Sequence, residues 1–95
     1  MTVPPAGAGL DDFVEVFEAA QQRDGRADVA RFLPPPRDPL YPAVLRELVC
    51  VDLDYGWDRG RPVPLDEYRR RFPDLFRDPA GRRAVVWEDY RQRRR

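Results

Sequence analysis

The stretch "GRPVPLDEYRRRFPDLF" (Gly60–Phe76) decides how the chain folds back on itself. Two prolines near its start keep the residues before them extended, so the stretch begins as a linker. A short helix is predicted next, because apolar side chains recur at helical spacing at Leu65, Tyr68 and Phe72. Pro73 ends this helix, since proline has no amide hydrogen to donate. The stretch therefore predicts a compact unit in which a short helix returns onto the element before it.

The segment before this stretch, residues 38–59, is the strongest predicted helix. Asp38 suits the N-cap, Pro39 suits the first helical position, and Gly60 suits a C-terminal stop. The apolar stripe of this segment is wide, which indicates a central helix that is covered from more than one side. The stripe comprises Tyr41, Val44, Leu45, Leu48, Val49, Cys50, Val51 and Tyr55.

Two shorter elements are predicted nearer the N-terminus. Residues 11–24 place apolar side chains at i, i+3, i+4 and i+7, as an amphipathic helix does, and Gly25 suits its end. Residues 28–33 are predicted to form one or two helical turns before a run of prolines. Residues 1–10 are rich in proline, glycine and alanine, which predicts a disordered leader.

A last helix is predicted at the C-terminal end. Asp78 suits its N-cap and Pro79 its first position. Its inner face is assigned to Val86, Trp87 and Tyr90. The expected fold is therefore all-α, with about five helices in one small, repeat-like bundle, and the helical interaction domain spans residues 11–95.

Facing apolar stripes predict the core, and the remaining aromatic and basic residues are candidates for partner contact. The predicted core residues are Phe17, Leu45, Leu48, Tyr55, Tyr68, Phe72 and Tyr90. Trp57 follows Gly56 near a helix end, so it is expected to be the best exposed aromatic residue. The interaction candidates are Trp57, Arg69, Arg70, Trp87 and Arg91, because aromatic residues and arginine are enriched at binding hot spots.

The residue types that are absent exclude most catalytic chemistry. All 17 basic residues are arginine, and the chain has no lysine, histidine, serine, asparagine or isoleucine. A Ser/His/Asp triad, a histidine metal site and a P-loop lysine therefore cannot be assembled within this chain. Asp52, Asp54 and Asp58 do not all share one helix face, which argues against a divalent cation site. We expect no catalytic residue, no metal and no cofactor, and hence no enzyme.

Two runs of arginine, residues 69–71 and 91–95, raise the question of phosphate or nucleic acid binding. Acidic residues lie near both runs, and the formal net charge is zero, with 17 acidic and 17 basic residues. Solvated helix faces are therefore favoured over a nucleic acid interface. The first run is expected to latch the short helix onto the long one through a carboxylate. The pairs considered are Arg70 or Arg71 with Asp54 or Asp58.

The single cysteine and the N-terminal sequence bear on location. Cys50 has no intramolecular disulfide partner and is expected to be a small core residue, which suits a reducing cytoplasm. The opening "MTVPPAGAGL" lacks the basic and apolar regions of a signal peptide. No apolar run approaches the ~18–20 residues of a membrane span. A cytoplasmic location without membrane contact in this segment is expected.

Internal similarity points to a repeated unit. The segments "VDLDYGWDRG" (51–60) and "VWEDYRQRRR" (86–95) share a valine, an Asp-Tyr pair and an arginine in the same register. Such offsets are typical of helical repeats. The second copy stops where the first continues into a glycine and proline spacer, so the register predicts that the natural chain continues past Arg95.

The segments "FEAA", "DGRADVARFL", "LRELV", "RGRPVP" and "EYRRRFP" occur in this order. In this the chain resembles, over Asp11–Arg95, the N-terminal non-catalytic region of planctomycete-type bacterial serine/threonine protein kinases. The sharpest likeness runs from Leu45 to Pro73. Asp28 stands where that family has a proline, and Arg61 stands where it has a glutamate. The glycine-rich loop, the His-Arg-Asp motif and the lysine of a kinase are absent.

The resemblance implies a regulatory adaptor module that precedes a serine/threonine kinase domain and contacts a protein partner or a covalently linked effector domain. Two other functions stay open. One is a death-like or effector-associated homotypic adaptor domain of a bacterial defence system, which would form homo-oligomers. The other is a small helical domain that binds nucleic acid. Light scattering across concentration separates the first two functions, and a salt-dependent gel shift tests the third.

Overall fold

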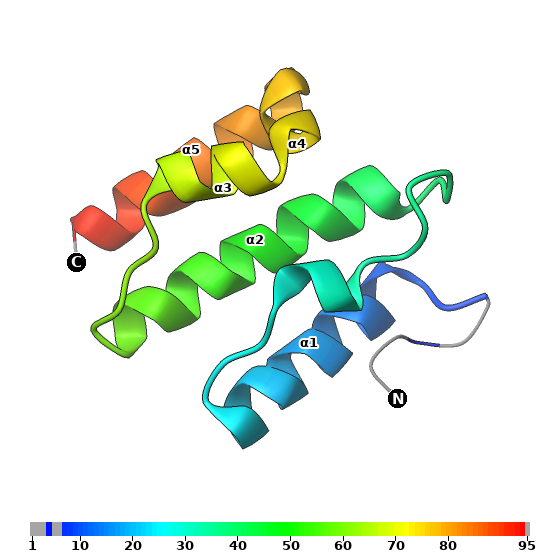
Figure 1. Cartoon of the computed structure of the whole chain (residues 1–95), viewed down its shortest axis with the longest axis horizontal. Coiled ribbons are helices and arrows are strands. Elements are labelled where there is room, and N and C mark those ends of the chain that lie inside the picture. Colours follow the sequence, from blue (N-terminus) through cyan, green and yellow to red (C-terminus); the bar gives the residue numbers. More distant parts are fainter. Residues whose placement is uncertain (1–3, 5–6, 95) are drawn as a thin grey trace.

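The computed structural model describes Pro4 and residues 7–94, and this part of the chain is all-helical (Figure 1). The elements in order are α1 (Leu10–Asp24), the 3₁₀ helix η1 (Val29–Phe32), α2 (Tyr41–Asp58), α3 (Leu65–Arg71), α4 (Pro73–Arg77) and α5 (Pro79–Arg93). The predicted class of a small helical bundle is confirmed. Within the described ranges, no helix has both the length and the apolar character that a membrane crossing requires.

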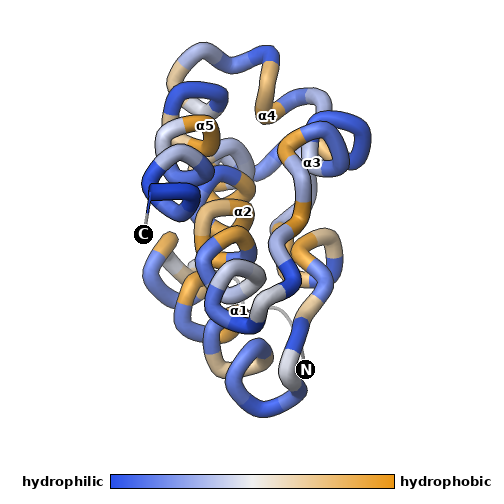
Figure 2. The backbone as a smooth tube through the Cα atoms, turned by 90° about the vertical axis from the view of Figure 1, so that its left-hand side faces the viewer, coloured by the Kyte–Doolittle hydropathy of each residue, from blue (hydrophilic) through white to orange (hydrophobic). Residues whose placement is uncertain are grey.

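The long helix α2 lies at the centre of the bundle. It packs against α1 and η1 on one side and against α5 and α4 on another. In Figure 1, α1, α2 and α5 run in the same direction and α3 returns in the opposite one. Figure 2 shows α1 at the bottom, α2 in the middle and α5 above, so α2 separates α1 from α5. This central position explains the wide apolar stripe of α2.

Two glycines in the left-handed conformation reverse the chain direction, one after α1 and one after α2. Gly25 follows α1 with φ 80°, and Gly60 follows α2 with φ 73°. Glycine takes this conformation without the steric penalty of a Cβ, which is why it ends helices so often. After each glycine a spacer leads into a short helix, η1 or α3. The two units therefore share the predicted order of long helix, glycine, spacer and short helix.

The predicted first residues are confirmed for α5 and are two residues too early for α2. Asp78 caps α5, and its carboxylate accepts hydrogen bonds from the amides two and three residues later, as predicted. The helix α2 begins at Tyr41, two residues later than predicted, with Pro42 in its first turn. Asp38 instead holds the turn before α2, because its Oδ1 accepts a hydrogen bond from the amide of Leu40 at 2.8 Å.

The predicted leader, residues 1–10, extends too far. The helix α1 begins at Leu10, and the amide of Gly9 donates to Asp12 Oδ2 at 2.9 Å across its first turn. Ala8 and Leu10 are half-buried and pack against the core, so this end of the segment is anchored. Residues 1–3, 5 and 6 of the predicted leader lie outside the described residues.

One apolar core joins α1, η1, α2, α3, α4 and α5. Phe17 of α1 and Phe32 of η1 meet edge to face, with ring centroids 5.3 Å apart. Burying one such side chain fully stabilises the fold by about 1.5–3 kcal/mol. The prediction is confirmed for the buried residues Phe17, Leu45, Leu48, Tyr68 and Phe72.

The predictions of Tyr55 and Tyr90 as core residues are wrong. Tyr55 is half-buried on α2; its hydroxyl accepts a hydrogen bond from Gln22, and the guanidinium of Arg59 lies 4.8 Å from its ring. Tyr90 is 48% exposed. The reason is that α5 presents a different face to α2 than its apolar residues suggest. The buried positions of α5 are Gly81, Val85, Asp89 and Gln92.

Gly81 sets the inward face of α5. A Cβ at this position would lie 2.8 Å from the side chain of Leu75 and 2.8 Å from its carbonyl oxygen, closer than real Cβ atoms come. Glycine therefore allows α4 to rest directly on α5. Residues four, eight and eleven positions later share the face of Gly81. Val85, Asp89 and Gln92 consequently point inward, whereas Trp87 points outward.

Candidate functional site

The outward face of α5 exposes large apolar side chains. Val86 is 42% exposed, Trp87 60% and Tyr90 48%, and no other large apolar side chain of the described residues is exposed. The rings of Trp87 and Tyr90 stack, with centroids 5.6 Å apart and 22° between their planes. Exposed apolar groups gathered in this way are typical of binding surfaces. We define the α5 face as Arg82, Arg83, Val86, Trp87, Tyr90 and Arg94.

Positive charge frames the rings. A shallow hollow of about 580 Å³ lies beside them and is also lined by Arg82 and Arg83. The guanidinium of Arg94 lies 5.5 Å from the centroid of the Tyr90 ring, within the range of a cation–π contact. Arg82, Arg83 and Arg94 form no ion pair with any residue in the described part of the chain. Three cations of the α5 face are therefore available to a partner.

The acidic residues of α5 do not offset this charge. The side chain of Glu88 is largely buried and pairs with Arg91 at 3.4 Å, and the buried Asp89 accepts a hydrogen bond from Arg93 at 2.8 Å. Gln92 is buried beside them and donates to Glu88 at 2.7 Å. The outward side of α5 therefore presents arginine and aromatic groups to solvent, with its carboxylates at the edge or inside.

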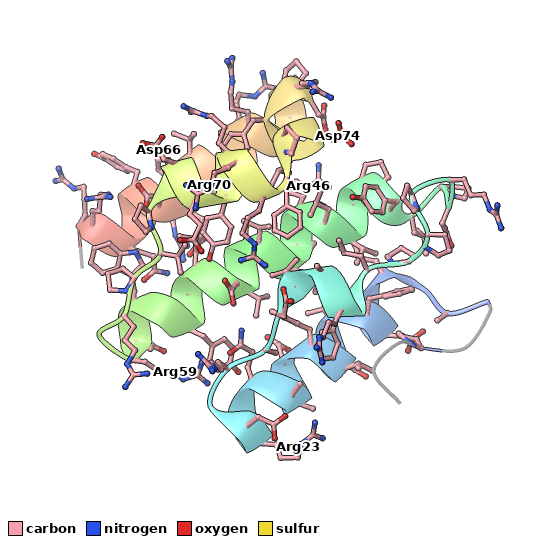
Figure 3. All side chains as sticks on the ribbon, viewed as in Figure 1. Arg23, Arg46, Arg59, Asp66, Arg70 and Asp74 are labelled. Atoms are coloured by element: carbon pink, nitrogen blue, oxygen red, sulfur yellow. The ribbon has the colours of Figure 1, made fainter. Side chains whose placement is uncertain are left out.

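The structure brings together only part of the predicted interaction residues. Trp87 lies at the centre of the α5 face, and the exposed Arg91 lies at its edge. The assignment of Val86, Trp87 and Tyr90 to the inner face of the last helix is wrong, because all three side chains are exposed. Arg69 and Arg70 lie on α3, where Figure 3 labels Arg70. Neither residue lines the hollow beside Trp87. Arg69 instead pairs with Asp66 at 3.6 Å.

The prediction that Trp57 is the best exposed aromatic residue is wrong. Its ring is half-buried, packs against the core and lies 5.7 Å below the guanidinium of Arg93. The indole Nε1 is buried and has no hydrogen-bond partner among the described residues. Gly56, the residue before it, does not open the helix end, because the linker after α2 returns close to it: a Cβ on Gly56 would lie 3.0 Å from the carbonyl oxygen of Arg61. Trp57 is thus a structural residue.

A partly buried polar network ties α1, α2 and α3 together. Tyr68 of α3 donates a hydrogen bond to Asp52 Oδ2 of α2 at 2.5 Å, and Gln21 of α1 donates to Asp52 Oδ1 at 2.8 Å. Arg59, just beyond α2, donates to the side-chain and main-chain oxygens of Gln21, both at 2.7 Å (Figure 3). These groups satisfy one another, so the network serves the fold. Sequence reasoning did not predict this network, although Gln21 and Asp52 were visible as polar residues within the apolar stripes of their helices.

The predicted latch from α3 takes a different form. Arg71 donates to Asp28 at 2.7 Å, so it ties α3 to the start of η1 rather than to α2. The prediction of Asp54 or Asp58 as its partner is wrong, because Tyr68 is the residue of α3 that faces α2. Arg70, the other candidate for the latch, is exposed.

Burial changes the ionisation of this network. Burial raises the pKa of Asp52, while the hydrogen bonds from Tyr68 and Gln21 oppose that rise. The pKa of the Tyr68 hydroxyl is raised as well, first by burial and then by the charge of Asp52. Tyr68 therefore stays protonated at neutral pH and acts as the donor.

The raised pKa predicts how the Asp52→Asn variant responds to pH. The ionised form of Asp52 is disfavoured in the fold, so its contribution to stability is present below its unfolded pKa of about 3.9 and is lost as the pH rises through the folded pKa. Asparagine does not titrate. We expect the stability of the wild type relative to Asp52→Asn to increase as the pH is lowered from about 7 to 4. Urea denaturation of both proteins across this range measures it, and a difference that stays flat or decreases contradicts the assignment.

Cys50 and the acidic side chains of the described residues show no sign of a reactive or metal-binding site. Cys50 is half-buried, and burial raises the pKa of its thiol to about 12, so it remains a neutral thiol near pH 7. Its placement agrees with the predicted packing role. In the part of the chain that the structure describes, no three His, Cys, Asp or Glu side chains gather as metal ligands would.

No protein-family model matches this sequence, and no curated protein and no solved structure matches it either. The chemistry of the α5 face therefore carries the functional argument. That face has apolar rings for burial and cations for recognition, and it lacks a hydrolytic or metal-binding constellation among the described residues.

Proposed function

We propose that this chain is a non-catalytic interaction module that docks a protein segment on its α5 face. The observation that supports this most directly is the stacked pair of Trp87 and Tyr90, which together with Val86 are the exposed large apolar side chains of the described residues. Removing such rings from water favours association by about 25 cal/mol per Å² of apolar surface. The unpaired arginines favour a partner that carries carboxylates around an apolar contact.

The wider setting of this module is proposed from the sequence resemblance over Asp11–Arg95. It supports a cytoplasmic regulatory adaptor of a bacterial signalling protein that precedes a serine/threonine kinase domain. The reading frame downstream of Arg95 in the native gene tests this setting. We expect it to encode a glycine-rich loop and a His-Arg-Asp motif. A different effector domain there would remove the kinase setting and leave the docking proposal in place.

Single-stranded nucleic acid is a second candidate for the α5 face, because arginines beside exposed rings also stack bases. Two observations favour a protein partner. The rings of Trp87 and Tyr90 stack on each other, and Arg94 lies over the ring of Tyr90, so part of the ring surface that bases would use is already in contact. The whole chain has a formal net charge of zero, so it has no long-range attraction for phosphates.

Titration with an acidic helical peptide tests the docking function. The peptide has about 18 residues, leucine along one face and glutamate elsewhere, which is long enough to be helical. In a Trp57→Phe background, Trp87 is the only tryptophan and reports binding by its fluorescence. We expect a blue shift that saturates, and binding at least ~10-fold weaker when lysine replaces glutamate in the peptide.

Matched variants distinguish specific binding at the α5 face from non-specific hydrophobic binding. Tyr90→Ala removes the stacked neighbour of Trp87 and is expected to weaken binding, whereas Arg61→Ala changes an exposed arginine that is not part of the α5 face and should bind normally. Circular dichroism checks that each variant remains helical. If the glutamate peptide does not bind while a single-stranded oligonucleotide does, the protein-docking function is wrong.

A further inference from the structure

A second charged surface lies on the outward side of α1. The first arginine of this helix, Arg23, comes in its last turn and pairs with Asp24 at 3.1 Å. The charged residues in the earlier turns of α1 are all acidic. Ala19 is exposed next to them, and its small side chain leaves room for a large aromatic ring to approach the helix. We define the α1 face as Asp11, Asp12, Glu15 and Glu18, of which the first three are exposed and the last is half-exposed.

The α1 face and the α5 face cannot neutralise each other within one molecule. The helix α2 lies between α1 and α5 (Figures 1 and 2). Because packed helix axes lie about 8–10 Å apart, the two faces are separated by roughly two Debye lengths or more at physiological salt. A net charge of zero is therefore compatible with an acidic face on α1 and a separate basic face on α5.

We propose that the partner of the α5 face is a second copy of this chain, which docks its α1 face there. This inference rests on the proposed docking function and names the partner. The charges are complementary, since the carboxylates of the α1 face meet Arg82, Arg83 and Arg94. Both helices have 15 residues, so their lengths of about 22 Å match. Trp87 then lies against Ala19 and the side-chain carbons of Glu15.

The contact is head-to-tail, because the two faces are different surfaces of the same molecule. Each contact leaves one free face of each kind, so molecules add in an open chain or a ring. One helix-on-helix contact is smaller than the ~800 Å² per partner of stable specific complexes. The association is therefore weak, in the micromolar to submillimolar range, and it weakens in high salt because its charges are exposed.

Light scattering and sedimentation of the folded chain, from about 10 µM to 1 mM, test this contact. We expect the mean mass of the wild type to rise beyond that of a dimer and to fall in roughly 0.5 M NaCl. Glu15→Arg disables the α1 face and Trp87→Ala disables the α5 face, so each variant alone should remain monomeric. Their equimolar mixture has one intact face of each kind, so it should form a dimer and stop there.

The outcomes separate this inference from the docking function. A wild type that stays monomeric throughout, while the glutamate peptide still binds, overturns self-association and keeps the docking function. If the wild type neither self-associates nor binds the glutamate peptide, both the head-to-tail contact and the docking function are overturned. A wild type that stops at a dimer, or a variant mixture that does not dimerise, contradicts the head-to-tail contact. Asp11→Arg and Arg94→Ala serve as second variants of the two faces if the first pair is not helical by circular dichroism.

Discussion

Leu48→Ala is expected to lower the free energy of unfolding by about 2–5 kcal/mol, a large part of the stability of a small domain. Leu48 is completely buried in the middle of α2, where α1 and α5 pack on either side. Alanine would leave a cavity that several helices would have to fill at once. Urea denaturation followed by circular dichroism at 222 nm, a wavelength that reports helix, measures the change.

Val86→Ala is the matched control for this variant. Its side chain is 42% exposed on α5, so the loss should stay within about 0.5 kcal/mol. Equal losses for the two variants would mean that α2 is not the centre of the core. An unchanged stability for Leu48→Ala alone would contradict the packing of α2 directly.

Tyr68→Phe is expected to lower the free energy of unfolding by about 1.5–3 kcal/mol, the usual range for a hydrogen bond to a charged group. The ring stays in the core, and only the hydroxyl that donates to Asp52 is lost. Asp52 Oδ2 would then lack its donor inside the fold. The same urea experiment measures the loss, and Tyr90→Phe, which changes an exposed tyrosine on α5, should have almost no effect.

A double-mutant cycle shows whether this loss belongs to the pair. Tyr68→Phe should cost markedly less in the Asp52→Asn background than in the wild type, with a coupling of at least ~0.5 kcal/mol, because the two residues share one hydrogen bond. Additive effects would mean that Tyr68 acts through the packing of its ring alone. The hydrogen bond to Asp52 would then contribute little to holding α3 against α2.

The all-helical fold was predictable because its strongest signals are local. Gly25 and Gly60 end helices through their own backbone conformation, and Asp78 caps α5 through its own side chain. Apolar spacing on α2 also identified its buried side, since Leu45 and Leu48 are surrounded by other apolar positions. These features depend on neighbours in sequence, so the chain alone contains them.

The orientation of α5 was not predictable from apolar spacing, because its inward positions are a glycine, a valine, an aspartate and a glutamine. Hydrophobicity favours the neighbouring set that contains Trp87 and Tyr90, and only the close approach of α4 reverses that choice. The acidic α1 face had a visible signal, since residues 10–18 contain four acidic residues and no arginine. Its meaning depends on where α5 lies in space, which no single helix reveals.

The close contact at Gly81 has a consequence for how this fold would diverge over time. Because the carbonyl of Leu75 occupies the space of a Cβ, position 81 tolerates only glycine unless α4 moves. The capping Asp78 is fixed three residues earlier by the same turn. Distant descendants should therefore keep an Asp-Pro-x-Gly signature while overall similarity fades. The residues they carry at the positions of Glu15 and Trp87 would then show which lineages kept the proposed docking chemistry and which exchanged it.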